Sequence, residues 1–196
     1  MVFYQGGIRM DNSIYWLWMT CRVISNETRL HLLKLILKDP SQRVKDLAAE
    51  TGLTPSATST QLKRLCEEYL ISAHRTGLTV HYSFGSEYAP AHILLLQAAL
   101  KKTLSAGVPY QSIIRQATGC THQRRIELIQ RIATAPSSIE ELVQTSRMSS
   151  SAVARHIQKL AARDYIVFKD GRYQSTKPAG HLALTLSKII IQASRY

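Results

Sequence analysis

The sequence predicts a mainly helical protein with small β-hairpins, built from two copies of one unit that follow each other along the chain. Two observations predict this fold. The halves of the 196-residue chain match, with residues 28–36 aligned to 124–132 and residues 40–41 aligned to 136–137. Apolar residues recur at helical spacing in both halves, and short segments around a glycine follow them. A repeat of this length decides the architecture before any element is assigned.

The repeat continues past a one-residue deletion in the second copy. The corresponding apolar positions are Leu47, Leu53, Ala57, Leu62 and Leu65 in the first copy and Leu142, Met148, Ala152, Ile157 and Leu160 in the second. Each copy closes with an apolar helix that follows Pro90 or Pro178. The boundary lies near Ser105 to Pro109, so we predict two domains, residues 11–106 and residues 107–196.

The first helix of each unit has one apolar face and ends at a proline. The face consists of Leu30, Leu33 and Leu37 before Pro40, and of Ile126, Ile129 and Ala133 before Pro136. A short helix over residues 44–50, a turn at residues 51–53 and a helix over residues 56–68 follow in the first copy. Gly52 suits the turn because a residue without a Cβ adopts positive φ at low cost. This order of elements predicts a helix-turn-helix.

Two short strands follow each helix-turn-helix. In the first copy they cover residues 71–75 and 80–84 around Thr76 and Gly77, and in the second copy residues 167–168 and 172–174 around Asp170 and Gly171. Each hairpin would form a wing. The sequence therefore predicts two tandem winged helix-turn-helix domains.

These segments resemble the ArsR-type winged-helix family of transcription regulators. The resemblance rests on residues 25–30, on Leu47-Ala48 and Gly52-Leu53 at the turn, and on residues 56–65. It extends over residues 24–84 and less closely over residues 121–175, where Arg147 replaces the turn glycine and either strains or reshapes the turn. The resemblance implies a regulator that binds operator DNA, pairs through its first and last helices, and often releases DNA when a metal or another effector binds.

The metal-sensing part of that resemblance does not carry over. The family's metal sensors place paired cysteines in the helix before the recognition helix, and residues 44–50 contain no cysteine. Cys21, Cys66 and Cys120 are too widely spaced for a zinc knuckle or a disulfide framework, and each is interpreted as a packing residue. His92 and His181 occupy equivalent places near helix starts and are interpreted as surface or capping residues. We expect no metal and no cofactor.

The charge of the chain indicates a polyanionic partner. The formal net charge is +12, from 25 Lys and Arg against 13 Asp and Glu. Residues 1–106 carry 12 basic and 8 acidic side chains, a net of +4, and residues 107–196 carry 13 and 5, a net of +8. The apolar stretch from Ile14 to Met19 is too short for a signal peptide or a membrane span. We therefore expect a cytoplasmic protein that binds double-stranded DNA and no membrane.

A recognition helix presents its outward side chains to the major groove, and a wing contacts the backbone. The outward positions of the two helices include one arginine that can bind guanine through two hydrogen bonds, Arg155. The predicted DNA-binding residues are Ser56, Ser59, Thr60, Lys63, Arg64, Arg75 and His81 in the first copy and Ser150, Ser151, Arg155, His156, Gln158, Lys159, Lys169 and Arg172 in the second.

The repeat leaves two arrangements open. If the terminal helices of the two copies pack together, one chain imitates a dimer, and its two different recognition helices read a non-palindromic site. Alternatively, two chains form a homodimer that buries residues 15–18 and 182–191 between them. The sequence does not choose between an intrachain and an interchain interface.

Sequence-specific DNA binding by a transcription regulator, a repressor, is the function that these patterns favour. Two alternatives have the same fold: a protein-interaction adaptor of the chromosome-segregation type and a plasmid replication initiator. An enzyme is not expected, because the sequence has no phosphate-binding glycine loop, no paired carboxylates in a plausible cleft and no nucleophile with an evident base.

Overall fold

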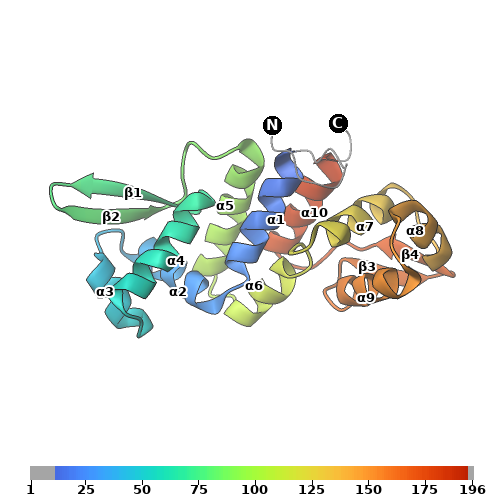
Figure 1. Ribbon diagram of the computed structural model, residues 1–196, viewed down its shortest axis with the longest axis horizontal. Coiled ribbons are helices and arrows are strands. Elements are labelled where there is room, and N and C mark those ends of the chain that lie inside the picture. Colours follow the sequence, from blue (N-terminus) through green and yellow to red (C-terminus); the bar gives the residue numbers. More distant parts are fainter. Residues whose placement is uncertain (1–11, 194–196) are drawn as a thin grey trace.

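Two winged lobes lie at opposite ends of the molecule, with a central group of helices between them (Figure 1). The computed structural model describes residues 12–193. The first half contains α1 (Asn12–Ile24), α2 (Glu27–Lys38), α3 (Val44–Thr51), α4 (Pro55–Glu67), β1 (Ile71–Thr76), β2 (Thr79–Phe84) and α5 (Ala91–Ser105). The second half contains α6 (Tyr110–Ala117), α7 (Gln123–Thr134), α8 (Ile139–Ser146), α9 (Ser150–Ala161), β3 (Ile166–Lys169), β4 (Arg172–Ser175) and α10 (His181–Gln192).

The predicted mainly helical fold with small antiparallel hairpins is confirmed. Strand β1 pairs with β2 from Ile71↔Phe84 to Thr76↔Thr79, and β3 pairs with β4 from Ile166↔Ser175 to Lys169↔Arg172. The structure also contains a helix that was not predicted from the sequence, α6, which lies directly after the expected domain boundary. The order of elements from α2 to α5 recurs from α7 to α10.

The turn between α3 and α4 and the turn between α8 and α9 have the same backbone conformation, although their residues differ. Gly52 has φ +67°, and Arg147 has φ +56° at the equivalent place after α8. Arg147 therefore keeps the turn in its glycine-like form and does not reshape it. A left-handed backbone costs an arginine about 1 to 2 kcal/mol relative to glycine.

One arginine in the first turn of α2 and one in the first turn of α7 form matching hydrogen bonds. Arg29 donates from Nε to the Val23 carbonyl at 2.6 Å and from Nη2 to that of Arg22 at 3.2 Å. Arg125 donates from Nε to the carbonyl of Gly119 at 3.0 Å and from Nη2 to that of Thr118 at 2.8 Å. Every residue of the second set lies 96 positions after its counterpart in the first. Each guanidinium thus binds backbone carbonyls in the segment that precedes its own helix.

The central helices α1, α5, α6 and α10 connect the lobes through one continuous apolar core. Helix α10 packs against α5, α1 packs against α6 and α7, and α6 also contacts α2. The fully buried side chains at these contacts include Leu17, Cys21 and Ile24 of α1, Ile113 and Ala117 of α6, Leu100 of α5 and Leu186 of α10. Because these helices come from both halves of the chain, the core of neither lobe is separate from that of the other.

Cys21 and Cys120 are buried in this core as free thiols, and Cys66 is half-buried. Cys120 donates from Sγ to the hydroxyl oxygen of Tyr165, 3.5 Å away, and that hydroxyl donates to the Gln116 carbonyl at 2.9 Å. Burial raises the pKa of the Cys21 thiol well above its usual value. Within residues 12–193, no helix has both the length and the apolar character needed to cross a membrane.

Candidate nucleic-acid interface

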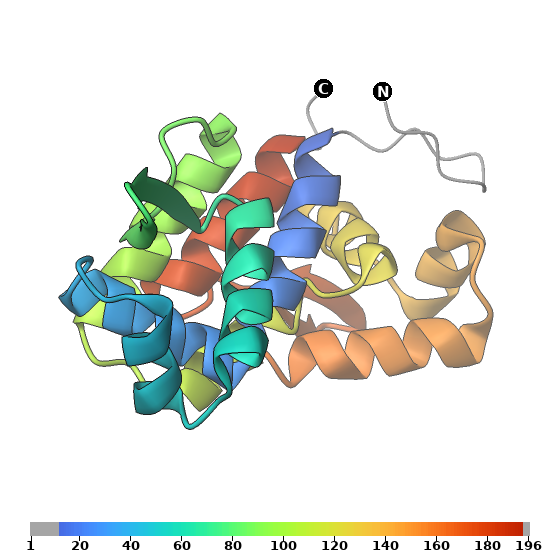
Figure 2. The same ribbon diagram turned by 60° about the vertical axis from the view of Figure 1, so that its left-hand side comes forward.

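Helix α4 presents a polar face to solvent and an apolar face to its lobe. Its first turn is capped by Thr54, whose side chain accepts a hydrogen bond from the Ala57 amide at 3.2 Å. Thr58, Leu62 and Leu65 are buried. All five predicted DNA-binding residues of this helix are exposed: Ser56, Ser59, Thr60, Lys63 and Arg64. In Figure 2, α4 (teal) stands at the front of its lobe.

Helix α9 has the same arrangement, with one correction. Ser149 caps it by accepting from the Ala152 amide at 3.3 Å. The predicted residues on its outward face are exposed: Ser150, Ser151, Arg155, Gln158 and Lys159. The prediction that His156 also faces outward is wrong, because this side chain is only 6% exposed. His156 belongs to the inward face because it follows Val153 by three positions and precedes Leu160 by four.

The exposed cations differ in whether their charge is already paired. Within the part of the chain that the structure describes, the side chains of Lys63, Arg155, Lys159 and Lys169 have no hydrogen-bond or ion-pair partner. Arg64 pairs with Glu67 at 3.2 Å. Unpaired cations can bind phosphates or base edges without first losing a protein contact. These four side chains are therefore the strongest DNA-binding candidates among the predicted set.

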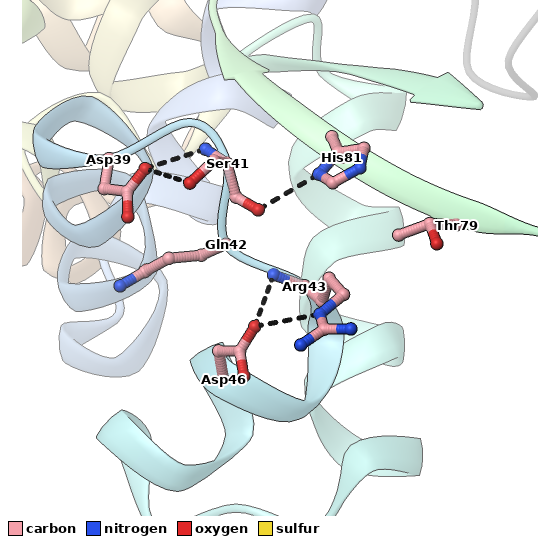
Figure 3. A pocket seen from close by; sticks show the side chains of 7 residues that line it. All are labelled: Asp39, Ser41, Gln42, Arg43, Asp46, Thr79 and His81. Atoms are coloured by element: carbon pink, nitrogen blue, oxygen red, sulfur yellow. Dashed lines mark hydrogen bonds and ion pairs between the residues drawn. The ribbon is translucent and has the colours of Figure 1, made fainter. Parts of the chain in front are cut away.

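Each wing is held against its own helix-turn-helix through the loop after its first helix. His81 of β2 is half-buried, and its Nδ1 donates to the Ser41 carbonyl at 3.0 Å (Figure 3). In the second lobe, the Tyr173 amide donates to the Ser137 carbonyl at 2.8 Å, and the Ser137 amide donates back to the Tyr173 carbonyl at 3.1 Å. The first hairpin thus has a fixed position beside α4, and the second has a fixed position beside α9.

Two predicted wing arginines are engaged in protein contacts. Arg172 binds both carboxylate oxygens of Glu141 at 3.0 Å and also donates to the Pro136 carbonyl at 2.8 Å. This arginine lowers the pKa of Glu141, although the larger cause is the hydrogen bond from the Ser138 amide. Arg75 remains exposed, and its Nε donates to the Gly77 carbonyl at 3.1 Å within the hairpin. The Arg172 contact makes this side chain a wing-positioning residue in the free protein.

His156 lies in an electropositive part of the second lobe. Its ring centroid is 4.7 Å from that of His122, the residue that caps α7, and among the described residues its buried Nδ1 has no hydrogen-bond partner. Burial, followed by the charges of His122, Arg125, Arg155 and Lys159, lowers the pKa of His156 to about 4. The imidazole is therefore neutral at pH 7. The concentrated positive charge also disfavours a metal cation at this pair of histidines.

The residue of the first lobe that occupies the place of His156 is Gln61. Its Oε1 accepts a hydrogen bond from Nη1 of Arg29 at 3.0 Å, which ties α2 to the recognition helix. In the second lobe, Nη2 of Arg125 instead donates to the Thr121 hydroxyl at 2.7 Å. The sequence analysis missed Arg29 and Arg125 as positioning residues. Both arginines occupy the same position in the aligned segments 28–36 and 124–132, and this agreement could have indicated a shared structural role.

One further exposed cation, just before the start of α9, was not predicted from the sequence. Arg147 is exposed, lies two positions before the Ser149 cap, and within the described chain has no ion-pair partner. The alignment of Arg147 with Gly52 predicted a feature of the backbone at this position and said nothing about the charge of the side chain. His92 is partly exposed near the start of α5, and His181 is exposed as the first residue of α10. Among the described residues, no three His, Cys, Asp or Glu side chains form a group that could hold a metal ion.

Comparison with known families identifies the first helix-turn-helix. Residues 25–71 match the model of a winged helix-turn-helix DNA-binding family. The match begins one residue before the Asn26 cap of α2 and ends at the first residue of β1, so it covers α2, α3 and the whole of α4. No curated protein shows a significant match to the chain. This segment is therefore a winged helix-turn-helix of the DNA-binding type.

Proposed function

We propose that this protein is a cytoplasmic, non-catalytic transcription regulator that binds specific double-stranded DNA through two ArsR-like winged helix-turn-helix domains, residues 11–106 and 107–196. The observation that carries the proposal is that the DNA-binding family match contains a recognition helix whose outward face is polar and includes Lys63, a cation with no side-chain partner among the residues that the structure describes. Repression requires only that the bound protein occupies the promoter, so we propose a repressor.

The second domain is supported by the recurrence of local structure after α6. The left-handed turn residue, the hydroxyl cap of the last helix and the arginine that binds two preceding carbonyls all recur in the second half. The chain also turns in the same way after each recognition helix, since Tyr69 and Asp164 both have positive φ. Such agreement, which holds even where the residues differ in chemistry, as at Gly52 and Arg147, supports a duplicated unit whose two copies bind the same kind of partner.

The charge of the second reading face supports DNA as that partner. Arg155 and Lys159 are exposed and unpaired within the described residues, and Lys169 adds a cation on the wing. A phosphate contact releases counterions, so each one makes the affinity depend more steeply on salt concentration. A protein-interaction adaptor needs no such field. The arrangement therefore favours a nucleic-acid partner over a protein partner.

Salt-dependent binding to duplex DNA tests this function. Fluorescence anisotropy of the full chain with a duplex library should give a log affinity that falls linearly with log salt concentration. Lys63→Ala and Lys159→Ala should each weaken binding to all sequences and lower the salt slope by about 1. Lys188→Ala removes an exposed lysine from α10 and is the matched control, with no change in slope expected. An absence of affinity for every duplex at low salt would refute the proposal.

A further inference from the structure

We infer that a single chain is the complete DNA-reading unit and that its partner is a non-palindromic duplex with two unlike half-sites. This inference rests on the proposed function and names the kind of DNA that the protein recognises. Three observations carry it. The central helices are arranged symmetrically, contacts within the chain involve the surfaces through which two chains would pair, and the outward faces of α4 and α9 (the reading faces) differ.

The central helices are related as the halves of a two-fold dimer. Helix α1 packs against α6, and α5 packs against α10, so each of these contacts joins equivalent elements. The contact of α1 with α7 has its counterpart in that of α6 with α2, and the contact of α1 with α5 has its counterpart in that of α6 with α10. A reciprocal pattern of this kind is what a closed two-fold interface produces.

The correspondence holds for individual buried residues. Leu17, Cys21 and Ile24 lie 96 positions before Ile113, Ala117 and Cys120, and all six are fully buried. The Asn26 cap of α2 lies the same number of positions before the His122 cap of α7. Helix α6 therefore stands in the second half where α1 stands in the first, and the two halves complete each other's cores.

Contacts within the chain already bury Leu17 and most of the apolar side chains of residues 182–191, and they leave Trp16 and Trp18 half-exposed. Trp18 donates from Nε1 to the Thr121 carbonyl at 3.0 Å, across the two halves. Trp16 contacts the Tyr69 ring edge-on, with the centroids 5.5 Å apart. Helix α10 is covered by α5, and five of its apolar side chains are buried: Leu182, Ala183, Leu186, Ile189 and Ile190. The dimer-like interface is thus intrachain, and a second chain is not needed to close it.

The two reading faces differ at nearly every outward position. The one-residue deletion aligns Ser59 with Ala154, Thr60 with Arg155 and Lys63 with Gln158. A guanidinium can bind guanine through two hydrogen bonds, whereas a threonine can offer one hydroxyl and a methyl group. The Thr60 hydroxyl donates to the Ser56 carbonyl at 3.1 Å, so it meets DNA mainly as an acceptor. Helices α4 and α9 therefore prefer different bases within one duplex.

Selection from a random duplex library, followed by the mass of the complex in solution, tests this inference with the full chain. The expected result is one chain per duplex and a consensus with two unlike half-sites, about 10 base pairs apart from centre to centre. Arg155→Ala should weaken binding about 5- to 150-fold and relax the preference at one half-site only. Thr60→Ala, also at an exposed position, should alter only the other half-site.

The variant Thr60→Arg gives the sharpest outcome because it makes the two reading faces more alike. It should gain affinity for a duplex in which the Arg155 half-site is repeated in inverted orientation, and the wild type should not prefer that duplex. A palindromic consensus, two chains on each selected site, or equal effects of Arg155→Ala on both half-sites would overturn the inference while leaving DNA binding intact. A lack of affinity for any duplex would instead overturn the proposed function itself.

Discussion

The replacement His156→Gln is expected to protect the protein against acid. Burial and neighbouring cations hold the pKa of His156 at about 4 in the folded chain, against an ordinary value of 6.5. The unfolded chain therefore binds a proton at a higher pH than the folded chain does. Above pH 6.5 the side chain is neutral in both states, so its titration does not change the free energy of unfolding. As the pH falls from 6.5 towards 4, the free energy of unfolding decreases.

The size of the effect follows from the shift. A difference between 6.5 and about 4 corresponds to at most about 3.5 kcal/mol, because one pKa unit equals about 1.4 kcal/mol. Glutamine does not titrate, so the variant loses this pH-dependent destabilisation. It also places at position 156 the residue type of the first lobe, where Oε1 of Gln61 accepts from Nη1 of Arg29 at 3.0 Å. We expect the variant to be at least as stable as the wild type at pH 7 and about 1 to 3 kcal/mol more stable near pH 4.

Urea unfolding of both proteins at a series of pH values measures this difference. Other titrating groups, such as the buried Glu68 of the first half, are common to the two proteins and largely cancel in the comparison. His31→Gln changes a histidine whose ring lies 6.2 Å from that of Tyr110 and serves as a control outside the cationic cluster. If wild type and His156→Gln lost the same stability between pH 7 and 4, the imidazole would not be held neutral by its surroundings.

Three further predictions concern packing and positioning in the second lobe. Gly119→Ala should destabilise the fold by about 2 kcal/mol or more in urea unfolding, because the new Cβ would lie 2.8 Å from Cδ2 of the buried Tyr165 ring; unchanged stability would mean that the ring moves freely. Arg125→Met should cost about 2 to 4 kcal/mol, since it removes the guanidinium donor from the buried Gly119 carbonyl and one of the two side-chain donors from the Thr118 carbonyl; a cost below that of an exposed substitution such as Lys188→Ala would refute a positioning role. Arg172→Ala should change global stability by at most about 1 kcal/mol, because the contact with Glu141 is exposed. It should increase hydrogen exchange in β3 and β4, because this contact holds the hairpin against α8; unchanged exchange would show that backbone contacts alone hold the hairpin.

Most of the local structure could be predicted from the sequence, because it depends on neighbouring residues. Apolar spacing predicted α2 and α7 within a few residues, and the glycine-containing turns located both hairpins. The outward positions of α4 followed from the same periodicity. His156 was the exception on α9, because its polarity suggested solvent while its spacing from Val153 and Leu160 placed it inside.

The repeat upstream of the helix-turn-helix could not be seen in the sequence. Cys21 and Ala117, or Ile24 and Cys120, share complete burial and not identity, so no alignment of letters relates α1 to α6. Likewise, the pairing state of the cations depends on partners elsewhere in the chain. Arg172 meets Glu141 only because the wing folds back beside α8.

By itself, then, the sequence determined the order of the helices and hairpins, the basic charge and the positions of α4 and α9, since periodicity and turn chemistry act over a few residues. Tertiary structure alone decided that α5 packs on α10 within one chain, that α1 packs against α6 across the two halves, and that the ring of His156 lies beside that of His122. The two helix contacts arise from apolar surfaces that meet across about half of the chain, and no local pattern encodes which surfaces will meet.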